Sequence, residues 1–335
     1  MQAAPKLRVA VVGLGWWGRI IVGLLKGCDK LQAVVGVDLA PGAAEGFCRE
    51  NGLEFSDDFD KTLRNSNIEA VILCTPHTLH CDQIVRAANA KKHVFCEKPL
   101  SLTRADAALA IEACRANGVA LAVGHERRFE PPLLELQRMA RAGELGTLLQ
   151  VEANFSQDKF LAMAPDNWRM SQKEAPAGPM TATGIHMLDL SIGLLGPAES
   201  VLARVQQLGS GLVNGDTLAI LVSFKSRANA LISAILATPF EGRFAVYGTK
   251  GWAEVRDKAH PEAPEGWTFT FQEKGKPRMS REYPPAKAVL ANLEAFADAA
   301  QGRAPYPVPQ EQMLDNIAAL EAVFKSAKSG KIEQV

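Results

Sequence analysis

The sequence of 335 residues has no excess of charge of either sign, because 37 Lys and Arg balance 37 Asp and Glu. A balanced chain has no overall field that would attract nucleic acid or an acidic membrane, so we expect neither partner. It also has no apolar run of the roughly 20 residues needed to cross a bilayer. The first residues, MQAAPK, lead straight into an apolar run and leave no room for a secretory signal. These absences favour a cytoplasmic protein.

Paired cysteine motifs are absent as well. The six cysteines show no CxxC spacing, and Cys74 and Cys96 fall within apolar runs, where a reduced thiol behaves as a small hydrophobic side chain. A zinc site could be imagined from a set of nearby side chains: His77, His80, Cys81, His93 and Cys96. Their spacing matches no zinc-ligand pattern, so we expect no metal. The cysteine usage indicates a reducing compartment.

The length and the apolar pattern predict two domains. In the first part of the chain, short apolar runs alternate with helix-like stretches, which predicts a parallel, doubly wound sheet of the Rossmann type. Residues 103–117 are one such helix, with Gly118 as its C-cap. The expected strands are 7–13, 32–38, 69–75, 92–97 and 119–124.

The pattern changes after Gly124. A helix is expected from Pro131, and the segment 258–285, rich in Pro, Gly and charge, is expected to be loop with one short strand. Two helices, near 286–301 and 309–328, close the chain. Longer strand-like runs lie between them, at 148–156, 199–207, 216–224, 229–236, 243–248 and 251–255. Such consecutive strands favour a largely antiparallel sheet.

The expected fold is therefore α/β with two domains. Residues 1–125 form a Rossmann domain, and residues 126–335 form an α+β domain that binds substrate. Its open sheet has too few helices to cover both faces. That open face predicts a homodimer or homotetramer.

Residues 9–18 read VAVVGLGWWG, an apolar strand that runs into the glycine pattern of a dinucleotide-binding loop. Gly13 permits the tight turn, Gly15 lets the backbone approach a pyrophosphate, and Gly18 lets the next helix pack on the strand. The helix N-terminus offers N–H groups and a partial positive charge to the phosphates. A second strand, LQAVVGVD, ends at Asp38, which can accept hydrogen bonds from a ribose.

Asp38 also bears on the choice of cofactor. Its carboxylate would repel a 2′-phosphate, and residues 39–42 contain no Arg or Lys to pair with that phosphate. NAD is therefore expected rather than NADP. Trp16 and Trp17, inside the glycine pattern, are expected beside the cofactor.

The loop CTPHTLH, residues 74–80, follows the third of these strands. Ligands of a doubly wound sheet bind at the carboxyl ends of its strands, so Thr75, Pro76 and His77 are candidate cofactor contacts. For His77 and His80 the favoured interpretation is nevertheless polarity at the surface or at a helix N-terminus.

The next strand ends in CEKPL, residues 96–100. Pro99 cannot continue the ladder and restricts Lys98 to an extended conformation. Lys98 is expected with Glu97 at the mouth of the cofactor cleft. There its ammonium group would donate to a substrate hydroxyl or carbonyl oxygen and polarise it for hydride transfer. A solvated surface lysine is the alternative.

Together, GLGWWG, CTPHTLH, KHVFCEKPL and VGHERRFEP resemble the glucose–fructose oxidoreductase/inositol dehydrogenase/MocA family over nearly the whole chain. EKP is the most specific mark. The resemblance implies a Rossmann domain, a C-terminal domain with an open sheet, and hydride exchange between a nicotinamide and a sugar-like alcohol. It matches Lys98 to the family's lysine, and Arg128, Phe129 and Pro131 to its RF-P stretch.

The resemblance extends to a helix that usually reads GGG-x-x-x-D-x-G-x-H-x-x-D and is AGPMTATGIHMLD here, residues 177–189. Gly184, His186 and Asp189 match, but Ala182 stands where the family has aspartate. Positions 182, 186 and 189 of a regular helix share one face, so one carboxylate is missing from that face.

His186 remains the candidate acid–base residue, with a buried core histidine as the alternative. Asp189 is expected either to orient the imidazole or to tie the helix to its neighbours. Thr181 and Thr183 flank Ala182 and could replace a lost hydrogen bond, so Thr183 is a candidate substrate contact.

The segment DNWRM, residues 166–170, precedes this helix. Arg169 is expected to bind a substrate oxyanion or carboxylate, and Trp168 to wall the nicotinamide pocket or support a loop. Arg128 is a further candidate substrate contact, although Arg127 or Arg128 is expected to serve packing or an interdomain salt bridge.

The sequence thus predicts an NAD-dependent dehydrogenase acting on a secondary alcohol of a sugar, polyol, cyclitol or related cyclic compound. A lyase or glycosidase assisted by a tightly held NAD is one alternative. A nucleotide-binding regulator without turnover is another, motivated by Ala182.

Overall fold

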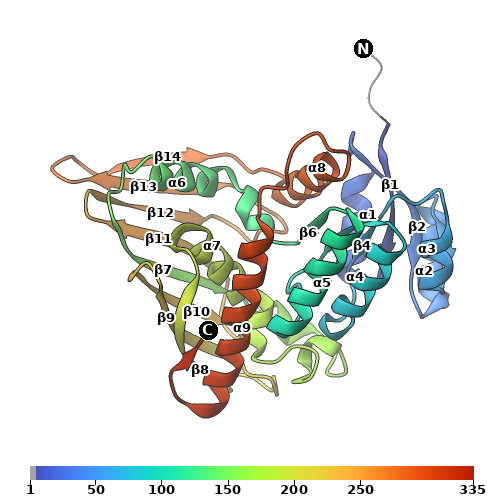
Figure 1. Cartoon of the computed structure of the whole chain (residues 1–335). Coiled ribbons are helices and arrows are strands. Elements are labelled where there is room, and N and C mark those ends of the chain that lie inside the picture. The colour runs from blue at the N-terminus through green and yellow to red at the C-terminus, as the bar shows by residue number, and fades with distance from the viewer. Residues whose placement is uncertain (1–4) are drawn as a thin grey trace. The chain divides into compact units, whose positions relative to one another are not determined.

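The computed structural model in Figure 1 describes residues 5–335 and consists of two compact units. The first unit comprises the chain up to His125 together with residues 289–313, and the second comprises residues 126–288 and 314–335. The division after His125 falls where the sequence pattern places the domain boundary. Residues 289–313 differ, because the sequence pattern assigns them to the second domain whereas they pack with the first.

The first unit contains a six-stranded sheet in the order β3-β2-β1-β4-β5-β6, with every neighbouring pair parallel. The strand order reverses between β1 and β4, and ligands of such sheets bind at this reversal, outside the carboxyl ends of the strands. The short strand β3 was not expected. The strands are β1 (Leu7–Val12), β2 (Leu31–Val37), β3 (Glu54–Ser56), β4 (Ala70–Leu73), β5 (His93–Cys96) and β6 (Leu121–Val123).

Helices alternate with these strands. The helix expected over 103–117 is present, and Gly118 follows it in the left-handed conformation at φ 66°, which confirms its role as the C-cap. The helices of this unit are α1 (Trp16–Leu25), α2 (Pro41–Glu50), α3 (Phe59–Arg64), η1 (His77–Leu79), α4 (His80–Asn89), α5 (Arg104–Asn117) and α8 (Ala288–Ala300).

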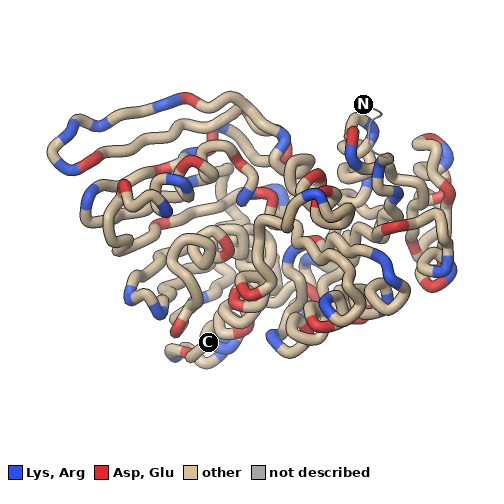
Figure 2. Tube along the Cα trace, turned by 45° about the horizontal axis from the view of Figure 1, so that its top comes forward, with Lys and Arg blue, Asp and Glu red and all other residues tan. Residues whose placement is uncertain are grey.

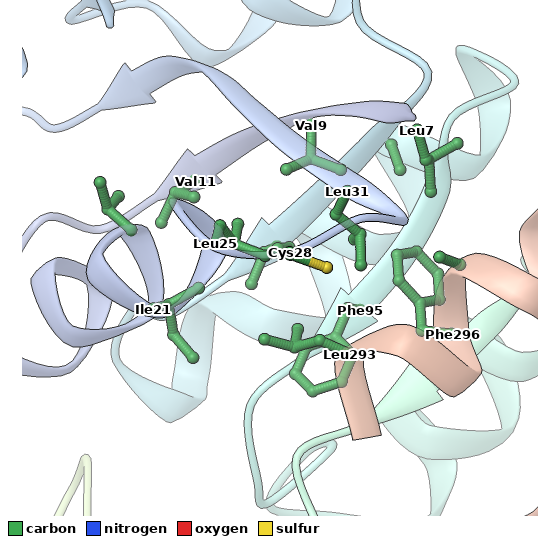
Figure 3. Packing of buried hydrophobic residues seen from close by; sticks show 14 of the residues in the cluster. Leu7, Val9, Val11, Ile21, Leu25, Cys28, Leu31, Phe95, Leu293 and Phe296 are labelled. Atoms are coloured by element: carbon green, nitrogen blue, oxygen red, sulfur yellow. The ribbon is translucent and has the colours of Figure 1, made fainter. Parts of the chain in front are cut away.

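Helix α8 completes the hydrophobic core of the first unit. Figure 3 shows Leu293 and Phe296 of α8 among the buried side chains of β1, α1 and β5. The ring of Phe296 meets that of Phe95 edge-on, with their centroids 5.8 Å apart. The amide of Asn292 donates to the carbonyl oxygen of Val123 over 3.0 Å, which ties α8 to β6.

The second unit is built on a nine-stranded sheet in the order β14-β13-β12-β11-β7-β10-β9-β8-β15. Its neighbours pair antiparallel, apart from the parallel pair of β7 and β10, as the sequence predicts for a largely antiparallel sheet. The strands are β7 (Leu148–Ser156), β8 (Ala198–Gln206), β9 (Thr217–Phe224), β10 (Asn229–Ile235), β11 (Glu241–Gly248), β12 (Gly251–Asp257), β13 (Trp267–Glu273), β14 (Met279–Tyr283) and β15 (Glu333–Gln334).

The expectation of one short strand within 258–285 was wrong, because this segment forms the hairpin of β13 and β14. Residues 267–273 read WTFTFQE, an alternation that buries Trp267 and Phe269 on one face. Gly275, at φ 80°, serves the turn between the strands. The proline-rich and charged flanks of this segment concealed the alternation.

Helices lie against one face of this sheet, with α6 contacting β12, and α7 contacting β7 and β10. On the opposite face, Leu202, Leu221 and Leu231 stand in register on three neighbouring strands and are 37–44% exposed. The helical elements are η2 (Glu126–Phe129), α6 (Pro131–Arg141), η3 (Lys159–Ala162), η4 (Trp168–Met170), η5 (Met180–Gly184), α7 (Ile185–Leu195) and α9 (Gln310–Ser329).

Basic and acidic side chains are interspersed along both units, as Figure 2 shows. Across residues 5–335, no helix combines the length and the apolar character that a membrane span would need.

Candidate functional site

The loop between β1 and α1 has the glycine geometry of a phosphate-binding turn. Gly13 has φ 89°, and a Cβ there would stand 2.8 Å from the carbonyl oxygen of Cys74. A Cβ at Gly18 would stand 2.0 Å from the carbonyl oxygen of Gly13, so α1 could not pack as it does. At Gly15, by contrast, no atom of residues 5–335 beyond its chain neighbours lies within 4 Å of the Cβ position. Gly13 and Gly18 therefore shape the turn, whereas the backbone at Gly15 is open to a ligand.

Asp38 follows β2, and its carboxylate is held by the backbone around it. Oδ2 accepts from the N–H of Leu14 over 2.7 Å, and Oδ1 accepts from the N–H of Ala40 over 3.0 Å. The carboxylate is therefore fixed beside the glycine loop, in the position that a ribose-binding acid needs. Together with the open position at Gly15, this arrangement fits a dinucleotide.

The two tryptophans of the loop differ in their surroundings. Trp16 begins α1 and is 48% exposed, whereas Trp17 packs against the core of the first unit. Their ring centroids are 5.5 Å apart. The Nε1 of Trp17 is buried and has no hydrogen-bond partner among residues 5–335. The exposed face of Trp16 is thus the accessible aromatic surface of this loop.

His77 begins η1 and His80 begins α4, so both stand at a helix N-terminus, but neither lies at the surface, because they are 7% and 0% exposed. The Nδ1 of His80 lies 2.8 Å from the carbonyl oxygen of Pro99, and its Nε2 lies 3.0 Å from that of Thr75. The ring therefore bridges the loops that follow β4 and β5. The hydroxyl of Thr75 also donates to the side chain of Gln83 over 2.6 Å.

Lys98 lies in the second of these loops and is half-buried, next to a cis peptide bond to Pro99. Its backbone N–H donates to Oε2 of Glu97 over 3.2 Å. The Glu97 side chain occupies the space beside Gly124, where a Cβ would come within 2.5 Å of the same oxygen. Buried Glu97 thus shapes the backbone that presents Lys98.

In the second unit, His186 lies in the first turn of α7 and is 4% exposed. Its Nδ1 is 3.7 Å from Oε2 of Glu126, which belongs to η2. The ring of Phe155 lies 5.9 Å from the imidazole, centroid to centroid. Sequence reasoning missed Glu126, although it stands within the VGHERRFEP segment that carries the family resemblance. No local spacing connects position 126 with position 186.

The regular helix expected over positions 182, 186 and 189 is not regular throughout, because Met180–Gly184 is a π-helix. A π-helical turn takes more residues than an α-helical turn, so the α-helical spacing between positions 182 and 186 does not apply. Ala182 packs against an apolar cluster of Met170, Leu212 and Leu236. The hydroxyl of Thr183 donates to the backbone oxygen of Pro179 over 3.3 Å, within the same π-helical turn.

Asp189 has a structural partner. Its carboxylate accepts from Nε and Nη2 of Arg128 over 2.6 and 2.8 Å, and all these groups are buried. Gly193 leaves room for the guanidinium, because a Cβ there would stand 2.3 Å from Nη1 of Arg128. Asp189 was expected either to orient the imidazole or to tie the helix to its neighbours. This geometry corresponds to the second role, because it joins α7 to η2. A substrate contact by Arg128 or Asp189 stays a prediction.

Arg169 and Trp168, in η4, stack on each other, with the guanidinium carbon 4.2 Å from the ring centroid. The backbone oxygen of Arg169 accepts from the side-chain amide of Asn214 over 2.8 Å. This anchoring fixes the pair locally. Their roles toward a substrate stay predictions.

Arg127, buried in the second unit, joins two acidic side chains. Its Nη2 donates to Asp257 over 2.7 Å and to Glu130 over 3.0 Å. Its guanidinium also lies over the ring of Phe155, 5.2 Å from the centroid. Burial, together with the charge of Asp257, raises the pKa of the Glu130 carboxyl well above its ordinary range. Arg127 therefore serves packing within the second unit, as the buried pair of Arg128 with Asp189 does.

Potential metal ligands do not gather in the described part of the chain. Over residues 5–335 no three or more His, Cys, Asp or Glu side chains form a group that could hold a metal ion. All six cysteines are free thiols.

Comparison with known families identifies the chain. Residues 7–125 match an oxidoreductase family with an NAD-binding Rossmann fold, and residues 133–254 match the GFO/IDH/MocA C-terminal domain. The chain belongs to the GFO/IDH/MocA oxidoreductase family. The expected Rossmann domain and open-sheet domain are confirmed, and so is a family whose members include sugar and inositol dehydrogenases.

Three relatives illustrate the family's range. The 1,5-anhydro-D-fructose reductase of Ensifer adhaerens is 27% identical over 321 residues, covering 94% of each chain. The scyllo-inositol 2-dehydrogenase (NAD(+)) of Bacillus subtilis is 37% identical over 143 residues, which are 42% of each chain. The crystal structure of an aldose-aldose oxidoreductase from Caulobacter crescentus, complexed with glycerol, has a TM-score of 0.86 at 26% identity and covers 99% of this chain and 100% of that one.

Proposed function

We propose that the protein is an NAD-dependent dehydrogenase that acts on a secondary alcohol of a sugar, polyol, cyclitol or related cyclic compound. The observation that carries this proposal is the first unit's arrangement of Gly15, Asp38 and Lys98. It combines an open glycine turn, a fixed acid suited to a ribose and a presented lysine at the carboxyl ends of β1, β2 and β5 of one sheet. Bound NAD would supply the hydride acceptor.

Lys98 and His186 have separate roles in this proposal. The Lys98 ammonium group donates a hydrogen bond to the reacting oxygen of the substrate and stabilises negative charge that develops there. His186 accepts the hydroxyl proton on its imidazole and returns it in the reverse direction. The substrate-binding residues proposed with them are Arg128, Trp168, Arg169, Thr183 and Asp189.

The apolar surroundings of Ala182 bear on the substrate class. A carboxylate at this position would grip ring hydroxyls, whereas Ala182 contacts an apolar cluster. A substrate with fewer hydroxyls on the ring, such as a cyclic diol or a hemiacetal, therefore belongs in the candidate set beside sugars and polyols.

The test is a screen of polyols, aldoses and cyclic diols with NAD, followed by absorbance of the reduced cofactor. Lys98→Ala is expected to bind NAD as the wild type does but to transfer hydride about 10²-fold or more slowly. Lys98→Arg is expected to fail too, because a planar guanidinium is not a compact donor. Exposed Lys91→Ala serves as the matched control.

Two outcomes would favour the alternatives. A substrate that is consumed without net reduced cofactor would support a lyase or glycosidase assisted by NAD. Tight NAD binding with no turnover of any compound would support a regulator. A Lys98→Ala variant that kept most of its turnover would contradict the role of Lys98.

We also propose that two copies associate through the open face of the second sheet. Leu202, Leu221 and Leu231 form an apolar row across three strands there, and the charged Glu152 borders the row on β7. Exposed apolar residues in such alignment are typical of an interface rather than of a solvated face.

A further inference from the structure

We propose that Glu126 is the positioning residue of His186, holding the imidazole in one tautomer and stabilising its protonated form. The inference rests on the proposed acid–base function of His186. Its physical basis is the Glu126–His186 pair itself, which can be tested without any substrate.

The pair joins two elements that are distant in sequence. Glu126 opens η2 and His186 lies in the first turn of α7, yet Oε2 and Nδ1 are 3.7 Å apart. Both side chains are shielded from water, at 14% and 4% exposed for Glu126 and His186. A distance of 3.7 Å is within ion-pairing range but longer than a hydrogen bond. Charge interaction at this distance is stronger in a shielded site than in bulk water.

Charged groups on the same two elements form ion pairs of their own. Asp189 is one turn along α7, but both its carboxylate oxygens accept from Arg128. Arg127, the neighbour of Glu126 in η2, is bound to Glu130 and Asp257.

Aromatic rings also lie next to the pair. The ring of Phe155 faces His186, and His260 lies beyond that ring, 5.8 Å from it. Ala182, in the turn that precedes His186, brings no ionisable group. Glu126 thus supplies the negative charge on the Nδ1 side of the imidazole.

This geometry has a direct chemical consequence. A carboxylate at Nδ1 favours the tautomer in which Nδ1 carries the hydrogen, which leaves Nε2 free to accept a proton. When Nε2 takes the hydroxyl proton of the substrate, the imidazolium that forms is stabilised by the charge of Glu126. Glu126 therefore acts through His186 and does not itself take up the proton.

The first experiment measures the titration of His186 by NMR in full-length protein labelled on histidine nitrogen, with His186→Asn to assign the signal. In Glu126→Gln, loss of the carboxylate charge should move the titration midpoint of His186 lower by about 0.5–1 pH unit. Glu126→Asp keeps the charge on a shorter arm and should recover part of the shift. Glu144→Gln removes an exposed carboxylate on the same unit and should leave the midpoint unchanged.

The second experiment follows kcat/KM for oxidation of the best alcohol against pH. The acid limb in Glu126→Gln should move to lower pH with the NMR midpoint. Its plateau should fall about tenfold, because the imidazolium is less stabilised. Far-UV circular dichroism and melting temperature check that each variant is folded.

The two experiments separate the possible failures. If the wild type oxidises no alcohol, the proposed function fails while the NMR titration still tests the pair. If folded Glu126→Gln keeps the wild-type midpoint and nitrogen shifts of His186, the inference is wrong even in an active dehydrogenase.

Discussion

At the scale of single residues, Asp38 is the basis for predicting which nucleotide the glycine loop prefers. Both of its oxygens are held by backbone N–H groups of Leu14 and Ala40, so the carboxylate cannot easily turn away from a 2′-phosphate. We predict that NAD binds at least about tenfold more tightly than NADP, or about 1.4 kcal/mol.

Isothermal titration calorimetry with each nucleotide checks the prediction for Asp38. The double variant Asp38→Ser, Leu39→Arg should reverse the preference, because Arg pairs with the phosphate. Asp57→Ser, at an exposed acid of the same unit, should leave it unchanged. Equal or tighter binding of NADP by the wild type would refute the prediction.

The buried ring of His260 makes the stability of the fold depend on pH. Burial, with the nearby cations Lys159 and Arg127, lowers the pKa of His260 to about 4. The ring in the unfolded chain takes up its proton near pH 6.5, whereas the native ring stays neutral. The stabilisation from the neutral ring is therefore complete above about pH 6.5 and is lost as the pH falls toward about 4.

We predict that the melting-temperature difference between the wild type and His260→Gln shrinks as the pH is lowered from 7.5 to 4.5, measured by calorimetry. Phe240→Leu is the matched control, because Phe240 packs on the same ring at 5.4 Å and does not titrate. The melting-temperature difference between the wild type and Phe240→Leu should stay constant over the same pH range. A constant deficit for His260→Gln would contradict the prediction.

Single residues were predicted correctly where a local sequence pattern fixes both their chemistry and their place in the fold. The glycine turn and Asp38 lie where the alternation of strand and helix places them, because that pattern is local. Glu126 escaped notice because its relation to His186 depends on two elements meeting in the folded unit. The burial of His77 and His80 was not predicted, since nothing in their immediate sequence indicates that packing buries them.

At the scale of elements, the buried cluster of Arg127, Glu130 and Asp257 ties η2, α6 and β12 together. Arg127→Met would leave Asp257 buried without its cation, so we predict a loss of about 3–5 kcal/mol in unfolding free energy. Glu130→Gln should cost far less, because burial raises the pKa of the Glu130 carboxyl and a neutral amide avoids the cost of burying a charge.

Urea denaturation of these variants measures the difference. Arg256→Met is the matched control on β12, since its pair with Glu241 is exposed and should contribute no more than about 1 kcal/mol. A loss for Arg127→Met as small as that of the control would show that the buried cluster does not stabilise the unit.

The elements themselves were largely predictable, because hydrophobic alternation is a local signal. Apart from β3, the strands of the first unit and those from β7 to β12 lie within a few residues of their predicted bounds. The π-helix at 180–184 was not predictable, since the same sequence fits an α-helix and tertiary packing selects the wider turn.

At the scale of the whole molecule, the open face of the second sheet bears on assembly. We predict that light scattering at micromolar concentration gives a mass of at least twice 36.1 kDa. Leu221→Glu, in the middle of the apolar row, should shift the protein toward monomer. Leu134→Glu changes an exposed leucine of α6 and should not. A wild-type monomer would refute this assembly.

Residues 289–313 come late in the chain but pack with the first unit, and this order has a consequence for folding during synthesis. Synthesis proceeds from the N-terminus, so the Rossmann sheet emerges from the ribosome before Leu293 and Phe296 have been translated. At about 5–20 residues per second, the intervening segment 126–288 takes on the order of ten seconds or more to appear. During that interval the apolar surface around Phe95 lacks its cover. Nascent chains of this protein should therefore present a binding surface to chaperones that the finished molecule no longer has.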